Sequence, residues 1–327
     1  MAVLTYIQAV NQALHEEMEQ NNKVFVLGED VGPKGGVFLA TEGLYDKFGE
    51  TRVIDTPLAE SAIAGVGIGA AMYGMRPVAE MQFADFIMPA VNQIISEAAR
   101  IRYRSNNDWT CPITIRAPYG GGIHGALYHS QSIEAIFANQ PGLKIVMPSN
   151  PYDVKGLLKS AIRDEDPVLF LEHKRAYRLL KEEVPEEDYT IPIGKADIKR
   201  SGDDVTVITY GLCVHYAKQA ADKLAEEGIS TEIVDLRTVY PLDQETIIQA
   251  ASKTGKVLLV TEDNKEGSII GEVSAIISEN CLFDLDAPIR RLAGPEVPAM
   301  PYAPPLEKEF MMNPDKIENA IRELAEF

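Results

Sequence analysis

Short apolar runs alternate with amphipathic segments through the first half of the chain. Runs that are apolar throughout are typical of strands buried on both faces of a parallel sheet. Such runs predict strands at residues 23–28, 77–82, 111–116, 143–148 and 167–172. Helical periodicity predicts helices at the N-terminus and near residues 60–74, 86–102 and 151–163. Because strands and helices alternate, the sequence predicts βαβ units around a parallel sheet.

The alternation stops at residues 181–197 and then resumes. Pro185, Pro192 and the acidic run 186–188 predict that this stretch is a linker over the surface. Beyond it, strands are predicted at 205–210, 231–235, 256–261 and 289–293, and helices at 214–227, 243–254, 269–281 and 314–326. Gly228 and Gly255 each follow a predicted helix end, where a left-handed residue is favoured. The proline-rich segment 300–305 is expected to be extended.

The fold class that follows is α/β, with two doubly wound domains and mainly parallel sheets. We expect the first domain at residues 1–185, a linker at 186–200 and the second domain at 201–327.

Composition narrows the possible partners and compartment. The chain of 327 residues has a formal net charge of −18, so nucleic acids and anionic membranes would repel it, whereas a basic protein surface would not. No apolar run approaches the roughly 20 residues that span a bilayer. The N-terminus lacks the basic start and cleavage site of a targeting peptide. Three widely spaced cysteines indicate a reducing cytoplasm and small buried side chains, not a zinc site.

Polar residues follow several of the predicted strands. They lie in the segments 27–31, 55–61 and 80–86, where a strand gives way to a loop or helix. In open α/β sheets the carboxyl edge is where ligands bind. These segments are therefore the first candidates for a binding site.

Glu60 opens a very apolar predicted helix. A carboxylate in a first helical turn is most often a partner of the helix dipole and nothing more. The functional alternative is a desolvated carboxylate that shares a proton with a ligand nitrogen. Gln82 and Phe86 are open to two interpretations in the same way, because an aromatic ring beside an amide suits either an ordinary core or a planar heterocycle.

The segment 117–129 combines three consecutive glycines, Gly120 to Gly122, with His124 and His129. Loops this rich in glycine and histidine are seldom only structural. The histidine spacing is a poor match to common zinc sites, and no third ligand is evident. A general acid/base or charge-stabilising role fits better.

Together these segments resemble the beta subunits of thiamine-diphosphate-dependent 2-oxoacid dehydrogenases. The resemblance spans essentially the whole chain. It is carried in family order by Gly28-Glu-Asp-Val31, Asp55-Thr-Pro-Leu-Ala-Glu60, Gln82-Phe-Ala-Asp-Phe86, the Gly/His loop and Val234-Asp-Leu-Arg237. The tract His124-Gly-Ala-Leu-Tyr-His-Ser-Gln131 is similar to the branched-chain type more than to the pyruvate type. A transketolase-like pyrimidine-binding domain and a transketolase C-terminal domain are implied.

The resemblance also implies roles for individual residues. Glu60 would hydrogen-bond the cofactor pyrimidine and promote catalysis, and Phe86, where many relatives carry tyrosine, would stack on that ring. Glu29, Leu58 and Gln82 would line the same cofactor site. His129 would assist substrate binding and acyl transfer to a lipoyl arm, with His124 as a second substrate residue.

A partner subunit is implied as well. Relatives bind Mg²⁺ and the diphosphate through a Gly-Asp-Gly…Asn motif, which this sequence lacks. An alpha subunit would supply both in an alpha2beta2 heterotetramer, which would dock on a dihydrolipoyl acyltransferase core. A structural K⁺ ion would be held, partly through backbone oxygens, at Ile113, Thr114, Ala161, Asp164 and Asp166. For residues 163–167 the alternative is a plain turn.

Two other functions stay open at this point. The substrate would be pyruvate or acetoin if the resemblance to the branched-chain type fails. A non-catalytic scaffold of the same fold is less favoured, because Glu60, Gln82, Phe86 and His129 are all present.

Overall fold

The computed structural model describes residues 2–327, which form two compact units. The first unit comprises residues up to Tyr119 together with Ile136–Ile193. The second comprises Gly120–Ala135 together with Gly194–Phe327. The Gly/His loop is thus grouped with the C-terminal half of the chain.

A parallel sheet forms the centre of the first unit. Its strands lie in the order β6 (Lys144–Val146), β7 (Val168–His173), β5 (Thr114–Tyr119), β4 (Arg76–Glu80), β2 (Val24–Gly28) and β3 (Val53–Asp55). Strands β2, β5 and β7 are buried along their whole length, as their apolar runs predicted. Strand β5 begins three residues later than the predicted run and continues to Tyr119.

The main helices of this unit begin at recognisable sequence signals. Helix α1 (Tyr6–Gln20) opens with a capping box between Thr5 and Gln8. Helix α6 (Pro151–Arg163) has proline at its first position, and the Asn150 side chain accepts the backbone N–H of Asp153 at 2.9 Å. Helix α3 is Glu60–Met72, and the short helices are α2 (Leu44–Phe48), α5 (Glu134–Ala138) and α7 (Ala176–Leu179).

The helix predicted near 86–102 is confirmed as a helical segment at residues 88–104, but it is not a regular α-helix. The chain forms short 3₁₀ turns at Ala84–Phe86, Met88–Ala90 and Ala98–Arg100, a π-helical turn at Gln93–Glu97, and helix α4 (Ile101–Arg104). Pro89 lies in the second of these turns and lacks the N–H that a regular helix would use.

The predicted linker at 181–197 contains a strand. Strand β8 (Lys181–Val184) pairs antiparallel with β1 (Ala2–Thr5). Only Val184 of β8 is buried, so the strand lacks the apolar pattern by which strands were predicted.

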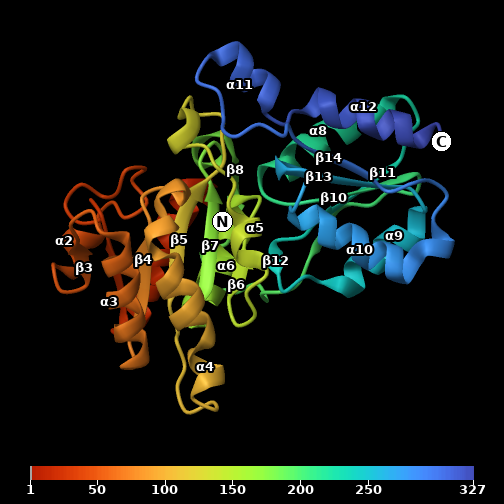
Figure 1. Cartoon of the computed structure of the whole chain (residues 1–327). Helices are drawn as coiled ribbons and strands as arrows, with labels where there is room; N and C mark the ends of the chain where they lie inside the picture. The colour runs from red at the N-terminus through yellow and green to blue at the C-terminus, as the bar shows by residue number, and fades with distance from the viewer. Residues whose placement is uncertain (1) are drawn as a thin grey trace. The chain divides into compact units, whose positions relative to one another are not determined.

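The second unit has its own mixed sheet. The strand order is β14 (Arg290–Gly294), β13 (Val257–Asn264), β10 (Val205–Thr209), β11 (Thr231–Asp235) and β9 (Asp197–Arg200). All neighbours are parallel except β9 and β11. Helices α8 (Leu212–Glu226) and α12 (Pro314–Ala325) cover one face, and α9 (Gln244–Thr254) and α10 (Ile269–Cys281) cover the other (Figure 1). Strand β12 is Thr238–Tyr240.

Two details of this unit bear on the sequence predictions. Gly228 and Gly255 have φ of +87° and +64°, so the predicted left-handed helix ends are confirmed. The prediction that residues 300–305 are extended is wrong from residue 304 onward. Helix α11 (Pro304–Phe310) begins there, with two prolines in its first turn.

Two predictions made from composition concern the cysteines and the apolar character of the helices. Cys111, Cys213 and Cys281 are free and buried. Within residues 2–327, no helix has both the length and the apolar character needed to cross a bilayer.

Candidate functional site

Adjacent strands bring the predicted cofactor residues to one edge of the first sheet. Gly28, the last residue of β2, pairs with Asp55 at the end of β3 and with Glu80 at the end of β4. Glu29, Glu60 and Gln82 follow these strand ends. They therefore lie along the carboxyl edge, where open α/β sheets bind ligands.

Glu60 is the first residue of α3 and is only 7% exposed. Its side chain forms no hydrogen bond or ion pair with any other residue between 2 and 327, although the helix N-terminus offers a favourable field. A buried carboxylate without a partner is costly unless a ligand satisfies it. The position therefore fits a group that donates or shares a proton.

Glu29 lies close enough to Glu60 for the two carboxyls to repel one another. It is 9% exposed, and its Oε1 atom is buried without a hydrogen-bond partner among the described residues. Burial raises the pKa of Glu29 above its ordinary value, and the charges of Glu60 and Asp30 raise it further. Two acids with unmet hydrogen-bonding capacity thus share this edge.

The remaining residues predicted for the cofactor site are Gln82, Phe86 and Leu58. The Gln82 amide donates to Asp30 Oδ2 at 3.2 Å. Phe86 is half-buried and meets Phe83 edge-on, with ring centroids 5.6 Å apart. Leu58 is 78% exposed, which is unusual for a large apolar side chain beside buried acids.

A neighbouring buried network was missed at the sequence level. Arg116 of β5 donates to Glu80 Oε2 at 2.6 Å and, in a fork, to both oxygens of Glu172 at 2.6 and 2.7 Å. The Tyr177 hydroxyl donates to Glu172 at 2.7 Å. The two carboxylates hold the pKa of Arg116 above its ordinary value against the opposing effect of burial. The sequence does contain a signal for this network, because Glu80, Arg116 and Glu172 are charged residues within otherwise apolar strands.

The two loop histidines belong to the second unit. Left-handed backbone occurs at Gly120, Gly122, His124 and Ala126. His124 Nδ1 lies 2.5 Å from Glu307 Oε2, and its ring is exposed. His129 follows the 3₁₀ turn Ala126–Tyr128 and is half-buried. Two glycines of the loop supply the conformational freedom that the sequence predicted.

Buried acids lie behind this loop. Burial and the charge of Asp263 raise the pKa of Glu134 to about 8, while Tyr210 donates a hydrogen bond to it at 2.8 Å. Burial also raises the pKa of Asp263 to about 6. A small pocket of about 150 Å³ is lined by Ser130, Gln131, Glu262, Asp263, Met300 and Phe310 among others.

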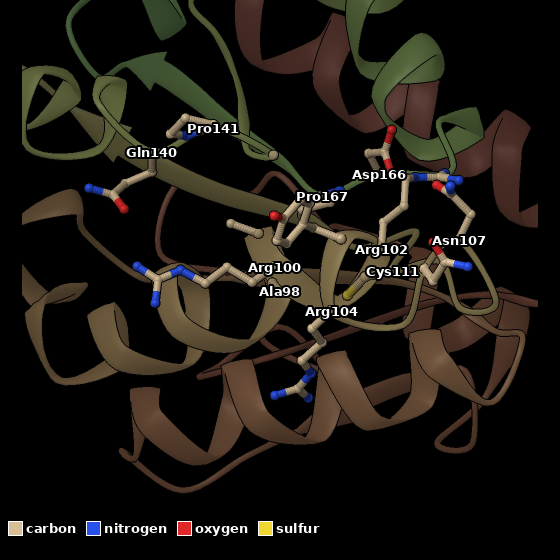
Figure 2. A pocket seen from close by; sticks show the side chains of 14 residues that line it. Ala98, Arg100, Arg102, Arg104, Asn107, Cys111, Gln140, Pro141, Asp166 and Pro167 are labelled. Atoms are coloured by element: carbon tan, nitrogen blue, oxygen red, sulfur yellow. Dashed lines mark hydrogen bonds and ion pairs between the residues drawn. The ribbon is translucent and has the colours of Figure 1, made fainter.

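Two of the five positions predicted for K⁺, Asp164 and Asp166, are already paired with cationic side chains. Lys144 Nζ lies 2.7 Å from both carboxylate oxygens of Asp164. Arg102 Nε donates to Asp166 at 2.5 Å, and both of these side chains are labelled in Figure 2. The backbone oxygens of Ile113 and Ala161 each accept one N–H and retain a second lone pair. Thr114 begins β5. A K⁺ ion would therefore depend on carbonyl oxygens, because both carboxylates are paired.

A larger hollow of about 1050 Å³ lies elsewhere on the first unit (Figure 2). Its lining includes Arg100, Cys111, Gly142 and Pro167. The last three precede strands β5, β6 and β7, so the hollow is at the amino edge of the sheet. It is therefore separate from the carboxyl edge that carries Glu29 and Glu60.

Comparison with known proteins gives a consistent result across the chain. The family model "Transketolase, pyrimidine binding domain" matches residues 2–179, and "Transketolase, C-terminal domain" matches residues 194–317. The chain is 79% identical to 2-oxoisovalerate dehydrogenase subunit beta of Bacillus subtilis (strain 168), over 327 residues and 100% of both chains. It is 49% identical, again over 100% of both chains, to pyruvate dehydrogenase E1 component subunit beta of the same organism.

A solved structure described as "Split gene transketolase, inactive beta4 tetramer" shares the fold. Its TM-score is 0.80 at 23% identity, covering 99% of this chain and 98% of that one. The predicted α/β, transketolase-like fold with mainly parallel sheets is thus confirmed. With full-length identities of 79% and 49% to its relatives, the chain belongs to the family of 2-oxoacid dehydrogenase beta subunits.

Proposed function

We propose that this chain is the beta subunit of a thiamine-diphosphate-dependent branched-chain 2-oxoacid dehydrogenase. The observation that carries the substrate class is 79% identity over the full length to the 2-oxoisovalerate enzyme, against 49% to the pyruvate enzyme. The reaction would be oxidative decarboxylation of branched-chain 2-oxoacids, with transfer of the acyl group to a lipoyl domain. The cytoplasm is the proposed compartment, since all three cysteines are free.

Glu60 is the proposed catalytic acid of the first unit. Its buried, unpartnered carboxyl fits an aminopyrimidine, because a proton shared with a ring nitrogen would offset the cost of desolvation. When bound, thiamine diphosphate would supply the electron sink that decarboxylation needs. Glu29, whose pKa is raised, would remain protonated to higher pH than an ordinary glutamate and so limit the repulsion beside Glu60.

The other cofactor residues would contribute shape and polarity. Phe86 offers an aromatic face and Gln82 an amide, which suits a planar heterocycle. Leu58, largely exposed in the single chain, would pack against the cofactor. His129 and His124 of the loop would bind the 2-oxoacid and assist acyl transfer, as exchangeable donors and acceptors of protons.

An alpha subunit is the proposed source of the remaining contacts. The sequence holds no Gly-Asp-Gly…Asn motif, so the diphosphate and Mg²⁺ would be held by that partner in an alpha2beta2 heterotetramer. The formal charge of −18 would favour docking on a basic surface of the acyltransferase core. A K⁺ ion at Ile113, Thr114, Ala161, Asp164 and Asp166 stays a prediction.

Reconstitution tests this function directly. The chain would be purified alone and with a co-expressed alpha subunit, and thiamine diphosphate binding with Mg²⁺ would be measured by calorimetry. We expect tight binding only in the complex, and tight binding by the beta chain alone would contradict the shared site. A panel of 3-methyl-2-oxobutanoate, 4-methyl-2-oxopentanoate, pyruvate and acetoin then tests the substrate. Turnover of pyruvate alone would refute the branched-chain assignment.

A further inference from the structure

One buried carboxylate holds His124 at two points. Glu307 of α11 is 3% exposed, and its Oε1 atom accepts the backbone N–H of His124 at 3.0 Å. Its Oε2 atom lies 2.5 Å from His124 Nδ1. A carboxylate at this distance requires the hydrogen on Nδ1, which leaves Nε2 as the ring nitrogen that can reach a ligand. The His124 side chain is 63% exposed, so the ring remains accessible.

The backbone held in this way is in a costly conformation. His124 and Ala126 have φ of +59° and +51°, in the left-handed region that non-glycine residues avoid. Such a residue is strained and persists only where its surroundings fix it. At His124 the fixing contact is the hydrogen bond from its own N–H to Glu307.

The start of the loop is fixed by β13 and by the same C-terminal segment. Gly121 donates its N–H to Glu262 Oε1 at 2.7 Å. A Cβ atom at Gly121 would lie 2.5 Å from Met300 Cε and 2.8 Å from Met311 Sδ, so a larger residue there would require these two side chains to shift. Met300 and Met311 flank α11. Residues 300–311, which we name the clasp, therefore contact the loop at Gly121 and again at His124.

We propose that Glu307 is a positioning residue for the active-site loop, and that it orients His124 with Nε2 directed at the acyl group during transfer to the lipoyl arm. The inference rests on the proposed function. It adds a role for the clasp, of which the sequence predicted only that residues 300–305 are extended. It also distinguishes His124 from a passive substrate contact, because a carboxylate that fixes one ring nitrogen prepares the other for proton exchange.

The test uses the reconstituted heterotetramer and two assays. Decarboxylation would be followed with an artificial electron acceptor, and acyl transfer with an isolated lipoyl domain. Glu307→Gln has a single acceptor oxygen, so it cannot accept from both the backbone N–H and Nδ1–H of His124, and its NH2 group would instead favour the tautomer with the hydrogen on Nε2. We expect it to lower kcat for acyl transfer on the order of 10- to 100-fold, with a much smaller effect on decarboxylation and on thiamine diphosphate binding. Glu309→Gln, on the exposed side of the same helix, is the matched control and should behave as wild type.

A double variant separates orientation from general stability. If Glu307 acts through His124, then Glu307→Gln combined with His124→Gln should be no slower than His124→Gln alone. Multiplied losses, or equal losses in both assays together with a lowered Tm, would overturn the inference. So would an unchanged acyl-transfer rate in His124→Gln, which remains measurable even if Glu307→Gln fails to assemble. A wild-type complex without activity on any 2-oxoacid would instead refute the proposed function.

Discussion

Two groups of buried acids share one edge of the first sheet, and they differ in their partners. Glu80 and Glu172 are both hydrogen-bonded to the guanidinium of Arg116. Glu29 and Glu60 are also buried, yet neither is paired with a cation among residues 2–327. Unpaired buried charge is destabilising unless a ligand compensates it. The presence or absence of a cationic partner therefore distinguishes structural acids from candidate site acids. Burial and residue type do not, because they are the same in both groups.

The paired group forms a rigid support beside the unpaired one. Glu80, Arg116 and Glu172 come from β4, β5 and β7, three neighbouring strands, and their contacts cross both strand pairs. Glu80 is also the last residue of β4 and pairs with Gly28, the last residue of β2. Glu29 follows Gly28 directly in the sequence. A fixed network here would hold the carboxyl edge in place while leaving Glu29 and Glu60 available to a cofactor.

The largest expected effect is a loss of decarboxylation activity when the unpaired acid Glu60 is replaced. Glu60→Gln keeps the size of the side chain but removes its acidity, and we expect kcat for decarboxylation to fall about 10²- to 10⁴-fold. Stability should be unchanged or slightly higher, because no internal hydrogen bond is lost and a like charge beside Glu29 disappears. Steady-state kinetics and thermal melts of the heterotetramer measure both, with exposed Glu50→Gln as control. Retained activity would refute the role of Glu60.

The next effect is on stability. Arg116→Met would leave Glu80 and Glu172 buried without their cation, and we expect a loss of about 3–5 kcal/mol in the free energy of unfolding of the first unit. Urea denaturation followed by circular dichroism measures this loss. Arg100→Met, at an exposed arginine, is the control and should change stability little. An equally small change for Arg116→Met would show that the paired acids are not structural.

Local pattern was enough to predict most elements. Helices α6 and α10 and strand β11 have the predicted bounds, since each has a clear period or apolar run with a recognisable start or end. Glu60 was likewise placed at the start of its helix. Segments whose stability comes from pairing and not from pattern, such as the polar strand β8, were missed.

The sequence could not predict which charged residues pair with one another. Arg116 lies 36 residues from Glu80 and 56 from Glu172, and Glu307 lies 183 residues from His124. No local period connects positions that are this far apart, so a paired glutamate and an unpaired one look alike in the sequence. The resemblance to a family suggested the role proposed for Glu60, but it implied none for Arg116 or Glu307.

The smallest effect concerns the pH dependence of the unpaired acids. The pKa of Glu29 is raised above its ordinary value of 4.5, first by burial and then by Glu60. The folded state therefore holds this proton more tightly than the unfolded state, so stability is full below pH 4.5 and declines as the pH rises toward the folded pKa. Glu29→Gln cannot ionise and escapes the decline. Its Tm should match wild type near pH 4 and exceed it near pH 8, by less than the Arg116→Met effect, and the gain should shrink in a Glu60→Gln background. A gain that is independent of pH, or equal for Glu50→Gln, would show that Glu29 does not carry the unfavourable charge.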